Sequence, residues 1–114
     1  MGKHVTPNPT ARQLLEQALA HLKARRLDEA ERGLDVVLAA APLQPDALQL
    51  YGLLQRLRGN REAAADYFRR SLSIKAAQPT VHRNLGNVLQ ELGQLEQAAM
   101  SYGEAVKYDP KSVE

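Results

Sequence analysis

Apolar residues recur at helical spacing along most of the chain, and no segment alternates between apolar and polar residues as a strand does. In residues 28–41, for example, Ala30, Leu34, Val37 and Leu38 fall on one face, which is the spacing of an amphipathic helix. The pattern predicts three pairs of helices. The first helices of the pairs are expected over 11–24, 45–58 and 79–92, and the second over 28–41, 61–75 and 95–108.

The same pattern returns with a period of 34 residues, which is the spacing between Ala18, Gly52 and Gly86. Self-similarity of this length is typical of an architecture in which each repeat is one supersecondary element. Three further series keep the period, the last of them less strictly: Ala30, Ala64 and Ala98; Leu34, Phe68 and Tyr102; Pro42, Ala76 and Pro110. The repeats divide the chain into an extended tail (1–10), three units (11–44, 45–78 and 79–112) and the start of a truncated continuation (111–114).

The third unit shows the repeat most fully, with His82, Leu85-Gly86, Leu89, Ala98, Tyr102 and Pro110 in order. These residues and spacings resemble the tetratricopeptide repeat (TPR), and the other two units follow in register. The resemblance implies an all-α fold, in which three helix-turn-helix units form a right-handed superhelical array. It also implies a non-catalytic module for protein–protein recognition.

Glycines are expected to shape both the packing and the turns. Gly52 and Gly86 would let the two helices of a pair approach closely, with the alanines of the repeat opposite them and the large residues between successive pairs. Gly59 and Gly93 are expected to end first helices in the left-handed conformation. Arg25 stands at that position in the first unit, which predicts a looser or differently shaped turn there.

Composition limits the classes of function. A chain of 114 residues without cysteine forms one domain with neither disulfides nor thiolate metal sites. It lacks the roughly 20-residue apolar run that spans a membrane, and residues 1–10 lack the apolar core of a secretory signal. We therefore expect a cytoplasmic protein. A net charge of +2 is too small to indicate nucleic-acid binding.

Residues for catalysis are sparse. The sequence has no Gly-rich phosphate loop, no His-Glu-x-x-His motif and no evident nucleophile–base pair. His21 and His82 take the positions of aromatic core residues, which favours a structural role for both. We expect no catalytic residue, metal or cofactor. The alternative is that the chain is the substrate-guiding domain of a larger enzyme, such as a glycosyltransferase, hydroxylase or sulfotransferase.

The resemblance implies that the first helices line a concave groove that binds a peptide or partner segment. Apolar residues at one end of this groove and polar residues at the other suit an extended or helical peptide. The candidate groove residues are Arg12, Leu15, Leu19, Gln49, Leu53, Arg83, Asn84 and Asn87. Two alternatives are open: residues 1–10 cover the leucines through Val5 and Pro7, or the groove has no ligand.

The third repeat is also similar to the repeats of O-linked N-acetylglucosamine transferase, in which groove asparagines bind substrate backbones. Asn84 and Asn87 match that pattern, whereas Glu16 and Leu50 hold the Asn84 position in the other units. Solvated surface residues are the alternative reading of this pair.

The resemblance argues against one partner class. Family members that bind the acidic tails of heat-shock chaperones use cations and amides to hold a terminal carboxylate. The matching positions carry no cation here: they are Leu15, Leu19, Leu50, Thr80 and Asn84.

Cations gather at two hairpin turns and are expected to form one basic edge of the array. They are Lys23, Arg25 and Arg26 at the first turn and Arg56, Arg58 and Arg61 at the second. This edge could bind phosphate, RNA or an acidic protein surface; the alternative is a solvated face. The near absence of aromatic residues there disfavours single-stranded RNA.

The last helix leaves a face on which a further helix would stack, around Ala99, Tyr102, Gly103 and Val106. We expect weak self-association through this uncapped face. The interpretation that we favour for the missing cap is that the chain is a fragment of a longer protein; the alternative is a complete protein that self-associates there.

Overall fold

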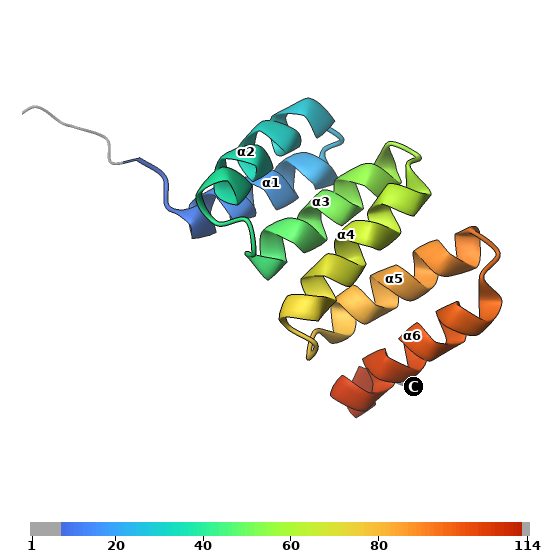
Figure 1. Cartoon of the computed structure of the whole chain (residues 1–114). Coiled ribbons are helices and arrows are strands. Elements are labelled where there is room, and N and C mark those ends of the chain that lie inside the picture. The colour runs from blue at the N-terminus through green and yellow to red at the C-terminus, as the bar shows by residue number, and fades with distance from the viewer. Residues whose placement is uncertain (1–7, 113–114) are drawn as a thin grey trace, which may run out of the picture.

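Six α-helices form three successive hairpins in the computed structural model, which describes residues 8–112 (Figure 1). The bounds of the helices are α1 (Ala11–Lys23), α2 (Leu27–Ala40), α3 (Pro45–Leu57), α4 (Arg61–Ile74), α5 (Pro79–Glu91) and α6 (Leu95–Tyr108), followed by a 3-10 helix, η1 (Pro110–Ser112). The expected all-α array of three helix-turn-helix units is confirmed. No helix within residues 8–112 is long and apolar enough to cross a membrane.

The first helix of each hairpin begins at a residue that suits a helix start. Thr10 and Gln13 form a capping box on α1: Thr10 Oγ1 accepts a hydrogen bond from the Gln13 amide (3.1 Å), and Gln13 Oε1 accepts one from the Thr10 amide (2.8 Å). Pro45 and Pro79 are the first residues of α3 and α5, where the missing N–H has no helical partner to lose.

The turns inside the three hairpins share one backbone geometry. Gly59 and Gly93 have φ of 84° and 78°, as the sequence predicted, and Arg25 has φ of 61°. In each turn the amide of this residue donates to the carbonyl three positions earlier, from Arg25 to Leu22 in the first (3.1 Å). The expectation of a looser first turn was therefore wrong, because Arg25 itself adopts the left-handed conformation.

Gly52 and Gly86, in the middle of α3 and α5, each face the aromatic residue of their own hairpin. A Cβ atom at Gly86 would lie 2.7 Å from Cε1 of Tyr102, and Gly52 stands in the same relation to Phe68. The residue opposite the glycine is thus the aromatic ring and not the alanine that the sequence suggested. Phe68 is completely buried and also belongs to the core shared by the second and third hairpins. Tyr102 packs inside the third hairpin, so only part of it contributes to the exposed face of α6.

Polar contacts join the two helices of the second hairpin and connect this hairpin to the first. The Ser71 hydroxyl, fully buried on α4, donates to the Pro45 carbonyl at the start of α3 (2.8 Å) and accepts from Gln78 Nε2 (3.2 Å). The Tyr51 hydroxyl donates to Asp35 Oδ1 of α2 (3.1 Å), and burial and this carboxylate raise the pKa of Tyr51. These contacts fix the first helix of one hairpin against its neighbours.

Candidate functional site

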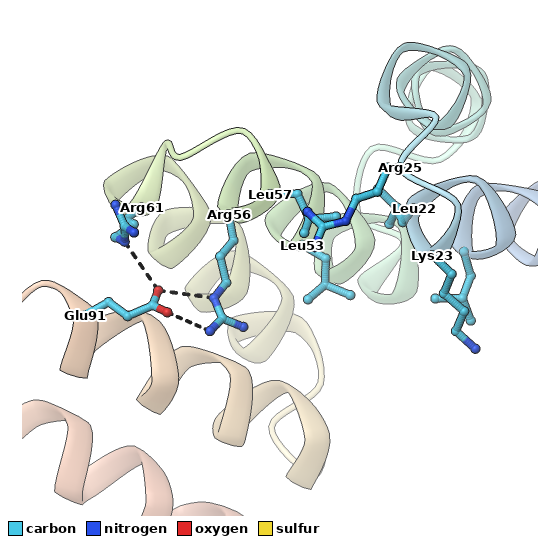
Figure 2. Close-up of a pocket in the computed structure, with 9 residues that line it drawn as sticks. Leu22, Lys23, Arg25, Leu53, Arg56, Leu57, Arg61 and Glu91 are labelled. Carbon is cyan, nitrogen blue, oxygen red and sulfur yellow. Dashed lines mark hydrogen bonds and ion pairs between the residues drawn. The ribbon is translucent and has the colours of Figure 1, made fainter.

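A cleft with a volume of about 610 Å³ lies between the C-terminal ends of α1 and α3 (Figure 2). Residues from the first turn, the start of α4 and the end of α5 complete its walls. The lining residues are Leu19, Leu22, Lys23, Arg25, Leu53, Arg56, Leu57, Arg61 and Glu91. It therefore combines two candidate groove residues with four of the cations that were assigned to the basic edge.

Four leucines form the apolar part of the cleft. Leu19 and Leu22 are three residues apart on α1, and Leu53 and Leu57 are four apart on α3, so each pair lies on one helical face. Leu22 is buried, Leu53 and Leu57 are half-buried, and Leu19 is 37% exposed. The cleft thus presents apolar surface that remains in water.

Lys23 and Arg25 lie at the end of the cleft next to the first turn. Lys23 is the last residue of α1, and the left-handed backbone of Arg25 follows directly after the C-cap. Both are exposed, and neither forms an ion pair or hydrogen bond through its side chain with any residue in 8–112. Their charges are therefore available to a partner.

Arg56 and Arg61 share one carboxylate at the other end of the cleft. Arg56 donates to Glu91 through Nη2 (2.7 Å to Oε2) and Nε (3.2 Å to Oε1), and Arg61 Nε lies 3.5 Å from Oε1 (Figure 2). The hydrogen bonds from Arg56 hold the pKa of Glu91 below its ordinary value against the opposing effect of burial, and Arg61 lowers it further. This Arg56–Glu91–Arg61 cluster connects α3, α4 and α5.

Arg26 and Arg58, the other two cations of the predicted edge, turn towards α2. Arg58 pairs with Asp28 (2.7 Å) and also with Glu31. Arg26 Nε lies 3.6 Å from Glu29 and 3.2 Å from His21 Nδ1. The structure therefore brings four of the six predicted cations to the cleft and engages two with acidic residues elsewhere.

The remaining candidate groove residues lie outside the cleft. Leu15 packs against the core of the first two hairpins, and the exposed Arg12 pairs with Glu16 (3.1 Å). Gln49, Arg83 and Asn84 are half-buried.

The two asparagines of the third unit differ in what they can offer. The Tyr102 hydroxyl donates to Oδ1 of Asn87 (2.6 Å), so this amide already has one partner, whereas no hydrogen bond of the Asn84 side chain is observed in residues 8–112. Leu50 is only 6% exposed and belongs to the core, so its assignment to an inward, open position was wrong. The suggested cover by Val5 and Pro7 lies outside the described residues.

Three residues of the cleft were not among the sequence candidates: Leu22, Leu57 and Glu91. A sequence signal existed for one of them, because Leu53, Arg56 and Leu57 are spaced three and four residues apart on one face of α3. Glu91 enters the cleft through the stacking of α5 on α3 and α4, which the spacing within one helix cannot reveal.

The surroundings of His82 are structural. His82 Nε2 lies 2.8 Å from the Ala76 carbonyl, and the ring stacks on Tyr108 with 5.5 Å between centroids. Within residues 8–112, no group of three or more His, Cys, Asp or Glu residues could hold a metal ion. The cleft offers recognition chemistry, in the form of apolar contact and cationic hydrogen-bond donors.

Comparisons with known proteins agree with this architecture. Tetratricopeptide repeat profiles match residues 15–80 and 81–112. The chain belongs to the tetratricopeptide repeat family. It is a TPR protein-interaction module, a kind of domain that is typically non-catalytic.

The similar proteins differ widely in the share of their length that this chain covers. Cellulose synthase operon protein C of Komagataeibacter sucrofermentans is 38% identical over 87 residues, which cover 75% of this chain and 6% of that protein. The chain thus spans a small fraction of this curated relative. A mutant O-GlcNAc transferase of Thermobaculum terrenum aligns with a TM-score of 0.76 at 31% identity, over 94% of this chain and 21% of that one.

A third comparison concerns a peptide complex. The first TPR domain of Spaghetti (RPAP3), bound to the HSP90 peptide SRMEEVD, aligns with a TM-score of 0.82 over 96% of this chain and 86% of that one. At 19% identity, this likeness establishes the shared fold alone.

Proposed function

We propose that the cleft between α1 and α3 binds an extended or helical segment of a partner protein. The observation that supports this most directly is the apolar surface of the four leucines, which stays partly exposed in a cleft of about 610 Å³. Apolar surface that is exposed in a concave site and bordered by polar groups is typical of a recognition surface. The chain also belongs to a family of protein-interaction modules.

Contact with the four leucines would supply affinity, and the cations of the cleft would orient the bound segment. Full burial of a leucine side chain contributes about 1.5–3 kcal/mol, and Leu19 and Leu53 still have part of that surface in water. A large aliphatic or aromatic side chain of the partner would cover this surface. Cations at both ends of the cleft would then fix the position of the segment.

Selection from a random twelve-residue peptide library tests the proposal, followed by mapping of a synthesised peptide through NMR amide shifts. We expect the shifts to cluster on the C-terminal halves of α1 and α3. Leu19→Ser should weaken binding at least fivefold. Ile74→Ser is the matched control, because Ile74 is 41% exposed on α4 and lies outside the cleft. Equal loss of affinity in both variants, or shifts elsewhere on the array, would contradict the proposal.

A second candidate function is that of a substrate-guiding domain within a larger enzyme. The 31% identity to the O-GlcNAc transferase of Thermobaculum terrenum supports it, because the chain aligns there with 21% of a longer protein. In that case the cleft would bind a segment of the substrate and hold it near a catalytic domain. The complete gene sequence checks this candidate, since it requires an encoded catalytic domain.

A further inference from the structure

The charges around the cleft indicate the chemistry of the segment that it binds. Building on the proposed function, we infer that the partner segment is acidic, with carboxylates on both sides of a large apolar side chain. We further infer that Glu91 occupies part of the binding site in the free protein.

The two ends of the cleft are both cationic. Figure 2 shows Leu53 and Leu57 between Arg56 on one side and Arg25 on the other. Four cations line the cleft and Glu91 is the one carboxylate among its lining residues. A purely apolar segment would displace water from these cations without offering hydrogen-bond acceptors in its place, and this desolvation is unfavourable. A segment with carboxylates on both sides of its apolar residue would satisfy both ends.

The end next to the first turn has no internal counterion. The charges of Lys23 and Arg25 are unpaired with respect to residues 8–112. The Arg25 side chain extends from the turn towards Leu57 (Figure 2). This end can accept a carboxylate without breaking any contact of the described chain.

The other end already contains a carboxylate. Glu91 comes from α5, whereas Arg56 and Arg61 come from α3 and α4, so the cluster is a contact between hairpins. One carboxylate is shared by two guanidinium groups, each of which has five N–H donors. Glu91 therefore occupies the place that a carboxylate of the partner would take between the arginines. Its negative charge also repels an acidic segment that approaches them. Its removal should strengthen binding of an acidic segment.

The composition of the cleft disfavours a nucleic acid. None of its lining residues is aromatic, so bases have no ring on which to stack. Four leucines would also remain in contact with the hydrated sugar–phosphate backbone. An acidic peptide fits both the leucines and the cations.

The test uses peptides selected from the random twelve-residue library and fluorescence anisotropy to measure their dissociation constants. Peptides selected on the wild type should be enriched in Asp and Glu around Leu, Ile or Phe. The double variant Lys23→Glu/Arg25→Glu should weaken their binding about tenfold. The control Arg32→Glu/Lys75→Glu makes the same change in net charge at exposed cations outside the cleft, and it should change affinity less than twofold.

Glu91→Gln supplies an independent test, because it should increase affinity. We expect an acidic peptide to bind about threefold to tenfold more tightly, with a steeper loss of affinity on raising the salt concentration. Glu96→Gln, at an exposed position on α6, makes the same charge change outside the cleft and should leave the affinity unchanged. Circular dichroism of each variant establishes that the helices are retained.

The outcomes separate the two proposals. Peptides that depend on Leu19 but carry no acidic bias, or weaker binding by Glu91→Gln, would overturn the acidic partner and leave the proposed function standing. Tighter binding of an oligouridine than of every selected peptide, with the same dependence on Lys23 and Arg25, would also overturn it. If no peptide binds in a Leu19-dependent manner, the proposed function fails and this inference fails with it.

Discussion

Gly52 on α3 lies beneath the ring of Phe68 on α4, so closely that a Cβ atom on Gly52 would be 2.6 Å from Cε1 of Phe68. Glycine in a helix costs about 1 kcal/mol relative to alanine. This cost is offset by the close approach of two helices around a fully buried ring. The pair explains why the second hairpin tolerates a poor helix former at the centre of α3.

Gly52→Ala is therefore expected to destabilise the protein by about 1–3 kcal/mol, because the ring has no space into which to move. Urea denaturation followed by circular dichroism measures the change. Gly103→Ala is the matched control: Gly103 is also inside a helix, but a Cβ atom there would have no neighbour within 4 Å. It should stabilise the protein by about 0.5–1 kcal/mol. Stabilisation by both variants would show that helix propensity outweighs the contact.

Phe68→Ala should destabilise the protein by about 3–5 kcal/mol, since it leaves a cavity in the core shared by the second and third hairpins. Domains of this size have a total stability of about 5–15 kcal/mol, so the variant should melt far below the wild type or fail to fold. Met100→Ala, at a side chain that is 72% exposed, should change the melting temperature little. A loss of only a degree or two in Phe68→Ala would rule out a central role for this ring.

Arg25→Gly should stabilise the fold and weaken partner binding. A residue with a Cβ atom in the left-handed region costs roughly 1–2 kcal/mol, which exceeds the entropy that glycine adds to the unfolded chain. We expect up to about 1 kcal/mol of added stability in urea denaturation. Gly59→Ala, at φ of 84°, should have the opposite effect on stability. Reduced stability in Arg25→Gly would mean that the arginine side chain contributes contacts that outweigh its backbone strain.

The Arg56–Glu91–Arg61 cluster should make stability depend on pH in the acidic range. Hydrogen bonds from Arg56 hold the pKa of Glu91 below its ordinary value of 4.5. Its contribution is thus complete above pH 4.5 and is lost as the pH falls through the lower pKa of the folded state. Melting temperatures of wild type and Glu91→Gln should differ most at neutral pH and converge as the pH falls through the lowered pKa of Glu91. A constant difference between pH 3 and 7 would contradict this linkage.

Chaperone tails should not bind with micromolar affinity. The positions that hold a terminal carboxylate in other family members include Leu15, Leu19 and the buried Leu50 here, so that carboxylate would lose its water without gaining a cation. The valine of a Glu-Glu-Val-Asp peptide is also smaller than the Leu, Ile or Phe side chain that we expect in the cleft, so titration of this peptide should show no saturable binding in the micromolar range. For peptides that do bind in the cleft, amidation of the C-terminus should leave the affinity unchanged. Micromolar binding of the free tetrapeptide would show that the leucines can rearrange.

Much of the fold could be predicted because the same residue pattern of a helix hairpin occurs three times in the sequence. The left-handed turns at Gly59 and Gly93 follow from the chemistry of glycine, which is local. The geometry at Arg25 could not be predicted in this way. An arginine enters the left-handed region only because both helices of the first hairpin hold the turn closed, and that constraint comes from tertiary packing.

The candidate site was predictable in part for the same reason. Leu19 and Leu53 lie in corresponding positions of two units, so the repeat places them near one another. The ion pairs of the arginines were harder to predict, because their long side chains can reach acidic residues on other helices. Arg58 pairs with Asp28 of α2 and Arg56 pairs with Glu91 of α5, and these partners are 30 and 35 residues apart in the sequence. Helical periodicity contains no information on such pairs.

The identical turn geometry of the three hairpins has a consequence for how such arrays diversify. The two helices of every 34-residue unit are joined by the same kind of turn, so duplication or exchange of a unit can preserve the helical stack. The cleft is different, because its walls come from the first turn, α3, α4 and the end of α5. Recognition is therefore inherited with the junction between units, and a reshuffled array would keep its architecture while acquiring a new set of partners.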